Sequence, residues 1–168
     1  MWIMRNLLTL LLLLFCHHVH AANQSQHHAL AEYYGRWLYT FDTNTLESKF
    51  NEMRGLSPSA QSAYKQTLDA LNRGALSRSG GVVAMVDEVQ AKWLDSHSGE
   101  WGSQEEYAVM LRVTYQHGAW LGRQQLTLKL TLDVPKNGDV VLQAFQPIKA
   151  SPTQWLNPAL ERSANCSK

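Results

Sequence analysis

The hydrophobic positions of this chain follow two different periods, one in each half. Between residues 29 and 75, apolar residues recur in steps of three and four, the period of an α-helix with one buried face. Between residues 82 and 145, apolar and polar residues alternate, the period of a strand with one buried face. The sequence therefore predicts helices first and strands afterwards.

The first half predicts three helices. The first begins near Ala29, and its apolar face is Leu30, Tyr33, Tyr34, Trp37, Leu38 and Phe41. In a short second helix, Asn44 and Glu47 have the spacing of a capping box, and Gly55 is placed to end it. The inner face of this helix is Leu46, Phe50 and Met53.

The third helix is predicted to open at Ser57-Pro58. Serine is a favoured N-cap, and proline is tolerated at the first helical position because its missing N–H would be unpaired there anyway. The break at Ser77–Gly81 separates this helix from the strands.

The second half predicts four strands, over residues 82–94, 106–117, 123–134 and 140–145. Asn137-Gly138, a favoured hairpin pair, joins the last two. The buried face expected for the first strand is Val83, Met85, Val89, Ala91 and Trp93. The second strand would bury Tyr107, Val109, Leu111, Val113 and Tyr115, and the third Leu126, Leu128, Leu130, Leu132 and Val134.

This order of elements predicts the α+β class, with N-terminal helices packed on a curved four-stranded antiparallel sheet. Long strands curl under their own twist, so we expect the sheet to cup the helices. The length of 168 residues suggests a single domain, which we place at residues 22–150. Prolines punctuate residues 151–168, which we expect to form a loosely ordered polar tail.

The N-terminus has the pattern of a secretory signal peptide over residues 1–21. Arg5 supplies a positive charge, Leu7–Phe15 is a short apolar run, and Ala21 closes a small-residue cleavage site. The run is about half the roughly 20 residues that a membrane-spanning helix needs. We therefore predict cleavage after Ala21 and a periplasmic or secreted domain. An uncleaved anchor is the alternative interpretation.

Cleavage also determines the cysteine chemistry and the charge of the mature chain. Cys16 follows the bulky Phe15 where a lipoprotein site needs a small residue, so no lipidation is expected. Cys166 then remains alone and forms no internal disulfide. Arg5 is the one charged residue lost, which leaves the mature chain close to neutral and gives it no general attraction to nucleic acid.

The sequence offers no motif for a catalytic, metal or cofactor site. Of seven histidines, three leave with the signal peptide, and His27 and His28 are adjacent, so they point about 100° apart on a helix. No nucleophile elbow, phosphate loop or dinucleotide fingerprint is present. We therefore expect no metal, no cofactor and no enzymatic activity.

Two groups of residues are candidates for function. Trp93, Trp101 and Trp120 fall at strand ends or in turns, where exposed aromatics favour a protein interface, although they would equally seal the edges of the sheet. Asp87 shares a strand face with apolar residues, so it is a candidate general base in a cavity with Tyr34 and Trp37. In the alternative interpretation, a bulge after Val86 turns Asp87 outward, or the buried face is the other one.

The predicted arrangement resembles the nuclear-transport-factor-2-like (cystatin-like) cone. Within that group, Tyr33–Val134 is similar to the periplasmic domain of the DotI/IcmL/TraM proteins of type IVB secretion and conjugation machines. The similarity is carried by Trp37–Asp42 (Trp-Leu-Tyr-Thr-Phe-Asp), Val113–Gln116 and Gln125–Val134. It implies a scaffold component that binds other subunits and is not an enzyme. Those relatives keep a transmembrane helix, so a cleaved chain would be a soluble periplasmic accessory or paralogue.

Three hypotheses of function follow. The first is a non-catalytic periplasmic structural or accessory subunit of a type IV secretion or conjugation apparatus, which binds other subunits and forms homo-oligomers. The second is a secreted cone-fold small-ligand binder or isomerase-like enzyme with a cavity near Tyr34, Trp37 and Asp87. The third is a periplasmic chaperone or adaptor with an exposed apolar groove.

Overall fold

The computed structural model describes residues 24–43, 45–73 and 81–156 and has helices first and strands afterwards. Residues 24–39 are helical, and β1 (Phe41–Asp42), α2 (Leu46–Asn51) and α3 (Pro58–Arg73) follow. The remaining strands are β2 (Val83–Ser98), β3 (Gly102–His117), β4 (Trp120–Pro135), β5 (Val141–Ala150) and β6 (Gln154–Leu156). The α+β class is confirmed, with a sheet of six strands instead of four.

The sheet is antiparallel throughout, with the order β1-β2-β3-β4-β5 and β6 paired to β4. β2 to β5 are the four predicted strands. The two additional strands are short. Phe41, expected on the first helix, pairs instead with Ala84, because the helix has ended by Thr40. β6 lies in the predicted tail, so the expectation of a loose tail is wrong for residues 154–156.

The predicted buried face of β2 is wrong in its first half. Ala84 and Val86 are buried, whereas Met85 is exposed. The register shifts between Val86 and Glu88, so Asp87 is an extra residue in a bulge. A bulge reverses the alternation of faces. Beyond it the predicted Ala91 is buried as expected, whereas Trp93, also expected to be buried, is 42% exposed.

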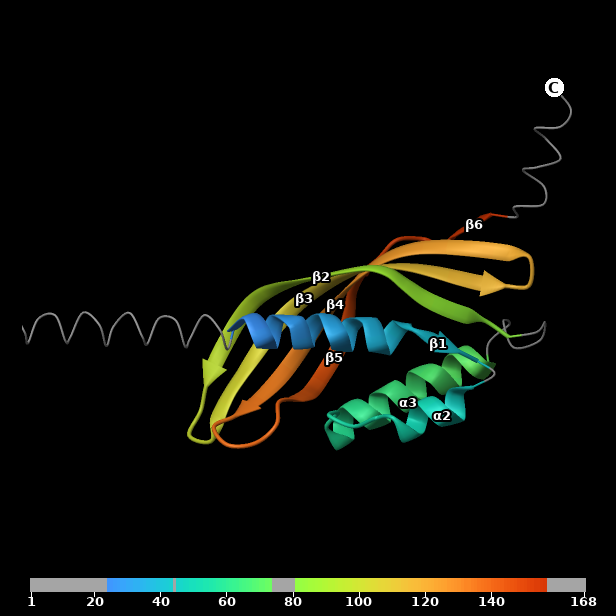
Figure 1. The fold of residues 1–168 in the computed structure, drawn as a ribbon. Helices are drawn as coiled ribbons and strands as arrows, with labels where there is room; N and C mark the ends of the chain where they lie inside the picture. Colours follow the sequence, from blue (N-terminus) through green and yellow to red (C-terminus); the bar gives the residue numbers. More distant parts are fainter. Residues whose placement is uncertain (1–23, 44, 74–80, 157–168) are drawn as a thin grey trace, which may run out of the picture.

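The buried faces of β3 and β4 agree with the predicted alternation. The inner side chains from Tyr107 to Val113 and from Leu126 to Leu132 are at most 4% exposed. The helix over residues 24–39 lies against this inner face, and α2 and α3 lie beside it, near β1 and β5 (Figure 1). The opposite face of the sheet, which we call the outer face, carries Met110 and Arg112 and is open to solvent.

The helix over residues 24–39 approaches β3 very closely at Gly35. A Cβ atom at this position would lie 2.6 Å from Cγ1 of Val109, well inside van der Waals contact. Glycine is therefore required here for the distance between helix and sheet.

Ser57 caps α3 as predicted: its Oγ accepts a hydrogen bond from the backbone N–H of Ala60 at 3.2 Å. Asn44, the signal peptide over residues 1–21 and Cys166 lie outside the described residues. Within the described ranges, no helix is both long and apolar enough to span a membrane.

Candidate functional site

The three tryptophans predicted as an interface do not form one patch. Trp101, 81% exposed, precedes β3, and Trp120 follows its other end. Because β3 has 16 residues, these two positions are separated by about 50 Å at a rise of roughly 3.3 Å per residue. Trp120 instead has an exposed neighbour from β6, since Trp155 pairs with Gly122, which lies two residues further along the same face of β4. The sequence analysis missed Trp155 because it lies in the predicted tail.

The three residues of the predicted cavity lie on two sides of the sheet. Tyr34 is buried and donates its hydroxyl to the carbonyl oxygen of Gly55 at 2.8 Å. The ring of Trp37 packs on Tyr64, with centroids 5.0 Å apart. Asp87 is exposed on the outer face, where its Oδ2 accepts a hydrogen bond from Thr114 at 2.6 Å. Asp87 is therefore turned away from Tyr34 and Trp37, as the bulge interpretation expects.

A row of polar side chains on the N-terminal helix binds the backbone of β2 along its edge. His28, Glu32 and Arg36 are spaced four residues apart and therefore share one helix face. Glu32 accepts from the N–H of Ala91 at 3.1 Å, and Nε2 of His28 lies 2.9 Å from the carbonyl oxygen of the same residue. Unpaired backbone groups on an edge strand invite pairing with other chains, and this row occupies some of them.

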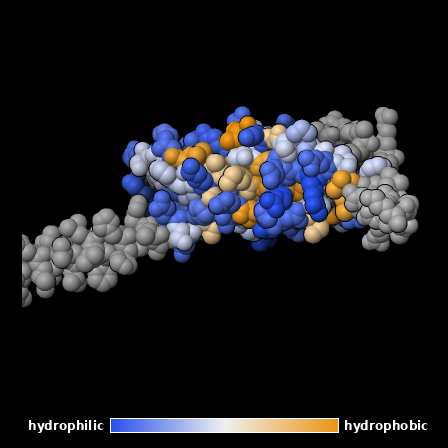
Figure 2. All heavy atoms as spheres, turned by 90° about the horizontal axis from the view of Figure 1, so that it is seen from above, coloured by the Kyte–Doolittle hydropathy of each residue, from blue (hydrophilic) through white to orange (hydrophobic). Residues whose placement is uncertain are grey.

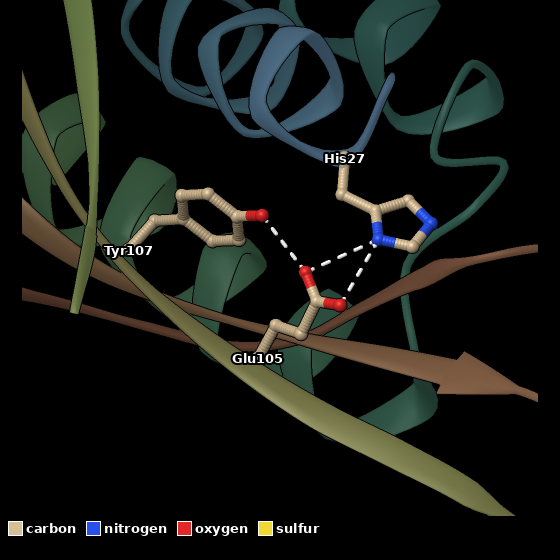
Figure 3. Close-up of polar contacts among 3 residues, drawn as sticks. All are labelled: His27, Glu105 and Tyr107. Atoms are coloured by element: carbon tan, nitrogen blue, oxygen red, sulfur yellow. Dashed lines mark hydrogen bonds and ion pairs between the residues drawn. The ribbon is translucent and has the colours of Figure 1, made fainter. Parts of the chain in front are cut away.

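A second polar cluster joins the same helix to β3 (Figure 3). Nδ1 of His27 lies 3.0 Å from the Glu105 carboxylate, and the Tyr107 hydroxyl donates to that carboxylate at 2.8 Å. Burial, followed by the hydrogen bond and the charge of Glu105, raises the pKa of Tyr107 above its ordinary value. The phenol therefore keeps its proton at neutral pH. This cluster fastens the helix to the sheet and contains no activated nucleophile.

Lys49 of α2 binds the C-terminal end of the N-terminal helix. Its Nζ donates to the carbonyl oxygens of Trp37 and Thr40 and lies 4.8 Å from the centroid of the Trp37 ring. Cations are favourable at helix C-termini because the last carbonyls there lack helical partners. Burial nevertheless lowers the pKa of Lys49 to about 8. The contact pattern assigns this lysine a structural role.

The candidate binding site is a hollow of about 690 Å³ in the sheet, which we call the outer hollow. Two rows of cross-strand neighbours supply its outward-facing side chains. One row is Glu88, Arg112 and Gln125, and the other is Gln90, Met110, Thr127 and Lys149. The neighbouring strands β2, β3, β4 and β5 therefore form the hollow together.

The outer hollow contains one ion pair and one further charged side chain. Arg112 donates from Nη1 to Oε1 of Glu88 at 2.6 Å, so these two charges compensate each other. Lys149 on the opposite side forms no ion pair within the described part of the chain. Across the described ranges, no three His, Cys, Asp or Glu side chains gather as a metal site. The arrangement is suited to binding through hydrogen bonds and one free positive charge.

The surface seen in Figure 2 is largely hydrophilic, with hydrophobic residues in separate patches. Large side chains at least 40% exposed include Met85, Met110 and Ile148 as well as the tryptophans named above. Exposed apolar side chains that are scattered in this way are common on protein surfaces.

The comparisons with known proteins give a likeness of fold. No family model matches the sequence, and no curated protein matches it. Among solved structures, the chain is similar to an IcmL-like type IV secretion system protein from Legionella pneumophila, with a TM-score of 0.54 and 20% sequence identity. The match covers 77% of this chain and 96% of that chain. Nearly the whole of that solved chain therefore has a counterpart here.

Proposed function

We propose that this chain is a non-catalytic periplasmic subunit, structural or accessory, of a type IV secretion or conjugation apparatus. It acts by binding other protein subunits. The observation that carries the proposal is the shared fold with the IcmL-like type IV secretion system protein, of which 96% is covered. The DotI/IcmL/TraM resemblance of Trp37–Asp42 supports the same assignment.

The polar clusters of the domain support a role without catalysis. His27, Glu105 and Tyr107 are engaged with one another, and Lys49 is engaged with the end of a helix. Catalytic groups need a space in which a reacting atom can lie beside them. Tyr107 is 0% exposed and Tyr64 is 2% exposed, so neither phenol is open to a substrate.

The periplasmic location rests on the signal peptide predicted over residues 1–21. A secreted domain whose positive and negative charges nearly balance, and whose exterior is hydrophilic, fits an aqueous compartment outside the cytoplasm. After cleavage the domain would meet membrane-bound subunits as a soluble partner.

The test is affinity purification of the tagged full chain from envelopes of the organism that encodes it, after mild crosslinking. We expect mass spectrometry to recover subunits of the secretion or conjugation channel. A tagged unrelated periplasmic protein is the control and should not recover them. Recovery of metabolic enzymes without any channel subunit, or a chain found in the cytoplasm, would contradict the proposal.

A further inference from the structure

The outer hollow contains polar side chains whose hydrogen-bonding groups are unused. Within the described chain, the side chains of Gln90, Gln125 and Thr127 form no hydrogen bond. A side-chain amide offers both a donor and an acceptor, which matches the alternating N–H and C=O groups of a polypeptide backbone. Gln90 lies on β2, and Gln125 and Thr127 lie on β4, so these groups are presented on both sides of β3.

The charge of the hollow selects for an acidic ligand. Glu88 and Arg112 neutralise each other at 2.6 Å. Lys149 is the charged side chain of the lining that lacks an ion-pair partner among the described residues. A carboxylate placed beside Lys149 would therefore gain an attraction that none of the described residues supplies.

Met110 provides an apolar contact next to this charge. Its side chain is 48% exposed on the outer face and lies in the same cross-strand row as Lys149. Methionine adapts its shape to different partners and is frequent on binding surfaces. The two side chains are separated by two inter-strand spacings, about 10 Å in total.

We propose that the outer hollow binds an extended acidic segment of a partner protein. One carboxylate of that segment pairs with Lys149, and an apolar side chain covers Met110. Three residues of polyproline-II conformation span about 9 Å, so an acidic and an apolar residue three positions apart match the spacing of the hollow. The proposal rests on the proposed function, because the partner it implies is another subunit of the apparatus.

The shape of the hollow favours a polypeptide segment over a small molecule. Small-molecule sites enclose most of their ligand in a largely apolar cleft. Here Glu88, Gln90, Met110, Arg112 and Lys149 are all exposed, so the hollow is wide and open. An extended segment can lie across it and continue beyond both sides.

The binding test uses a short fluorescent peptide with glutamate and leucine three residues apart, and a second peptide with lysine in place of glutamate. Fluorescence anisotropy should show that the full chain binds the acidic peptide and not the basic one. Lys149→Glu and Met110→Asp should each weaken binding at least about fivefold. Lys136→Glu, the same charge change in the exposed β4–β5 turn, is the matched control and should bind normally.

Three results would overturn the proposal: no binding of the acidic peptide, equal binding of both peptides, or equal weakening by Lys136→Glu. A companion purification of the Lys149→Glu chain from envelopes separates the two proposals. If wild type and variant recover the same channel subunits in equal amount, the hollow is not the contact while the proposed function stands. If the peptide binds as expected but wild type recovers no channel subunit, the proposed function fails and the hollow remains a peptide site.

Discussion

Arg36 in the N-terminal helix donates a hydrogen bond from Nη1 to the carbonyl oxygen of Val86, 2.7 Å away. Val86 is the last residue before the bulge at Asp87, so this contact holds the helix to the edge of β2 where the strand changes its alternation. Glu32 and His28, one and two helical turns earlier, contact the backbone N–H and carbonyl oxygen of Ala91. The helix therefore both covers the inner face of the sheet and occupies its edge.

Removing the guanidinium at this edge should destabilise the domain. We expect Arg36→Met to lower the free energy of unfolding by about 1–2 kcal/mol, because it removes a charge-assisted hydrogen bond and keeps most of the packing. Urea unfolding measures the effect. Arg54→Met, a change at an exposed arginine, is the control and should be nearly neutral. Equal stability of the two variants would show that the edge contact contributes nothing.

Because Gly35 lies so close to β3, replacing it with alanine should lower the stability of the domain, although helix propensity alone predicts an increase. Alanine is favoured over glycine in a helix by up to about 1 kcal/mol, but the added methyl would lie 2.6 Å from Val109. We expect Gly35→Ala to destabilise by about 1–3 kcal/mol through overpacking. At Gly99 the nearest atom to an added Cβ is 3.6 Å away, so Gly99→Ala should be tolerated. Thermal unfolding of both variants measures the two effects. A Gly35→Ala variant that is more stable than wild type would refute the close contact between residue 35 and Val109.

The contacts in Figure 3 predict that removing the Tyr107 hydroxyl alone lowers the stability of the domain. Tyr107→Phe removes the donor to Glu105 while the ring still fills its buried position. We expect the free energy of unfolding to fall by about 1 kcal/mol or more, because the partly buried carboxylate of Glu105 is left with one hydrogen bond fewer. Tyr33→Phe, at a tyrosine that is 57% exposed, is the matched control. Chemical denaturation showing the same stability for both variants would contradict this assignment.

Alkaline pH should first stabilise and then destabilise the domain. Burial lowers the pKa of Lys49 to about 8 from 10.5, so between these values the unfolded chain binds more protons and stability rises with pH. Burial raises the pKa of Tyr34, Tyr39 and Tyr64 above 10, and that of Tyr115 to about 12. Above pH 10 the folded chain therefore holds more protons, and stability falls.

Urea titrations between pH 7 and 11 would reveal this maximum. In Lys49→Met the rise between pH 8 and 10 should disappear, whereas the fall above pH 10 should remain. A wild-type stability that decreases steadily from pH 8 upward would contradict the assigned burial of Lys49.

The sequence predicted the regular elements well and the local irregularities poorly. The alternation in Leu126–Val134 predicts a buried strand face because every second residue is leucine or valine, and the structure agrees. The predicted face is wrong in the first half of β2, since Val83 and Met85 on one face and Ala84 and Val86 on the other are all apolar, and a single extra residue at Asp87 reverses the pattern.

The sequence does not predict the outer hollow, because the polar residues and the methionine that line it are of ordinary types and lie on four different strands. Gln90, Met110, Thr127 and Lys149 become neighbours only through the strand register. The edge contacts of His28 and Arg36 likewise depend on where the helix crosses β2. One signal was present in the sequence: the spacing of four between His28, Glu32 and Arg36 marks a polar stripe on a helix whose other face is apolar.

Deletion of the gene in its own organism, followed by a measurement of type IV-dependent transfer of a reporter substrate, tests the central claim most directly. We predict that transfer falls towards the level of a strain that lacks the secretion channel, and that the wild-type full chain restores it. Transfer that stays at the wild-type level in the deletion strain, with all channel subunits still assembled, would contradict the assignment of this chain to the apparatus.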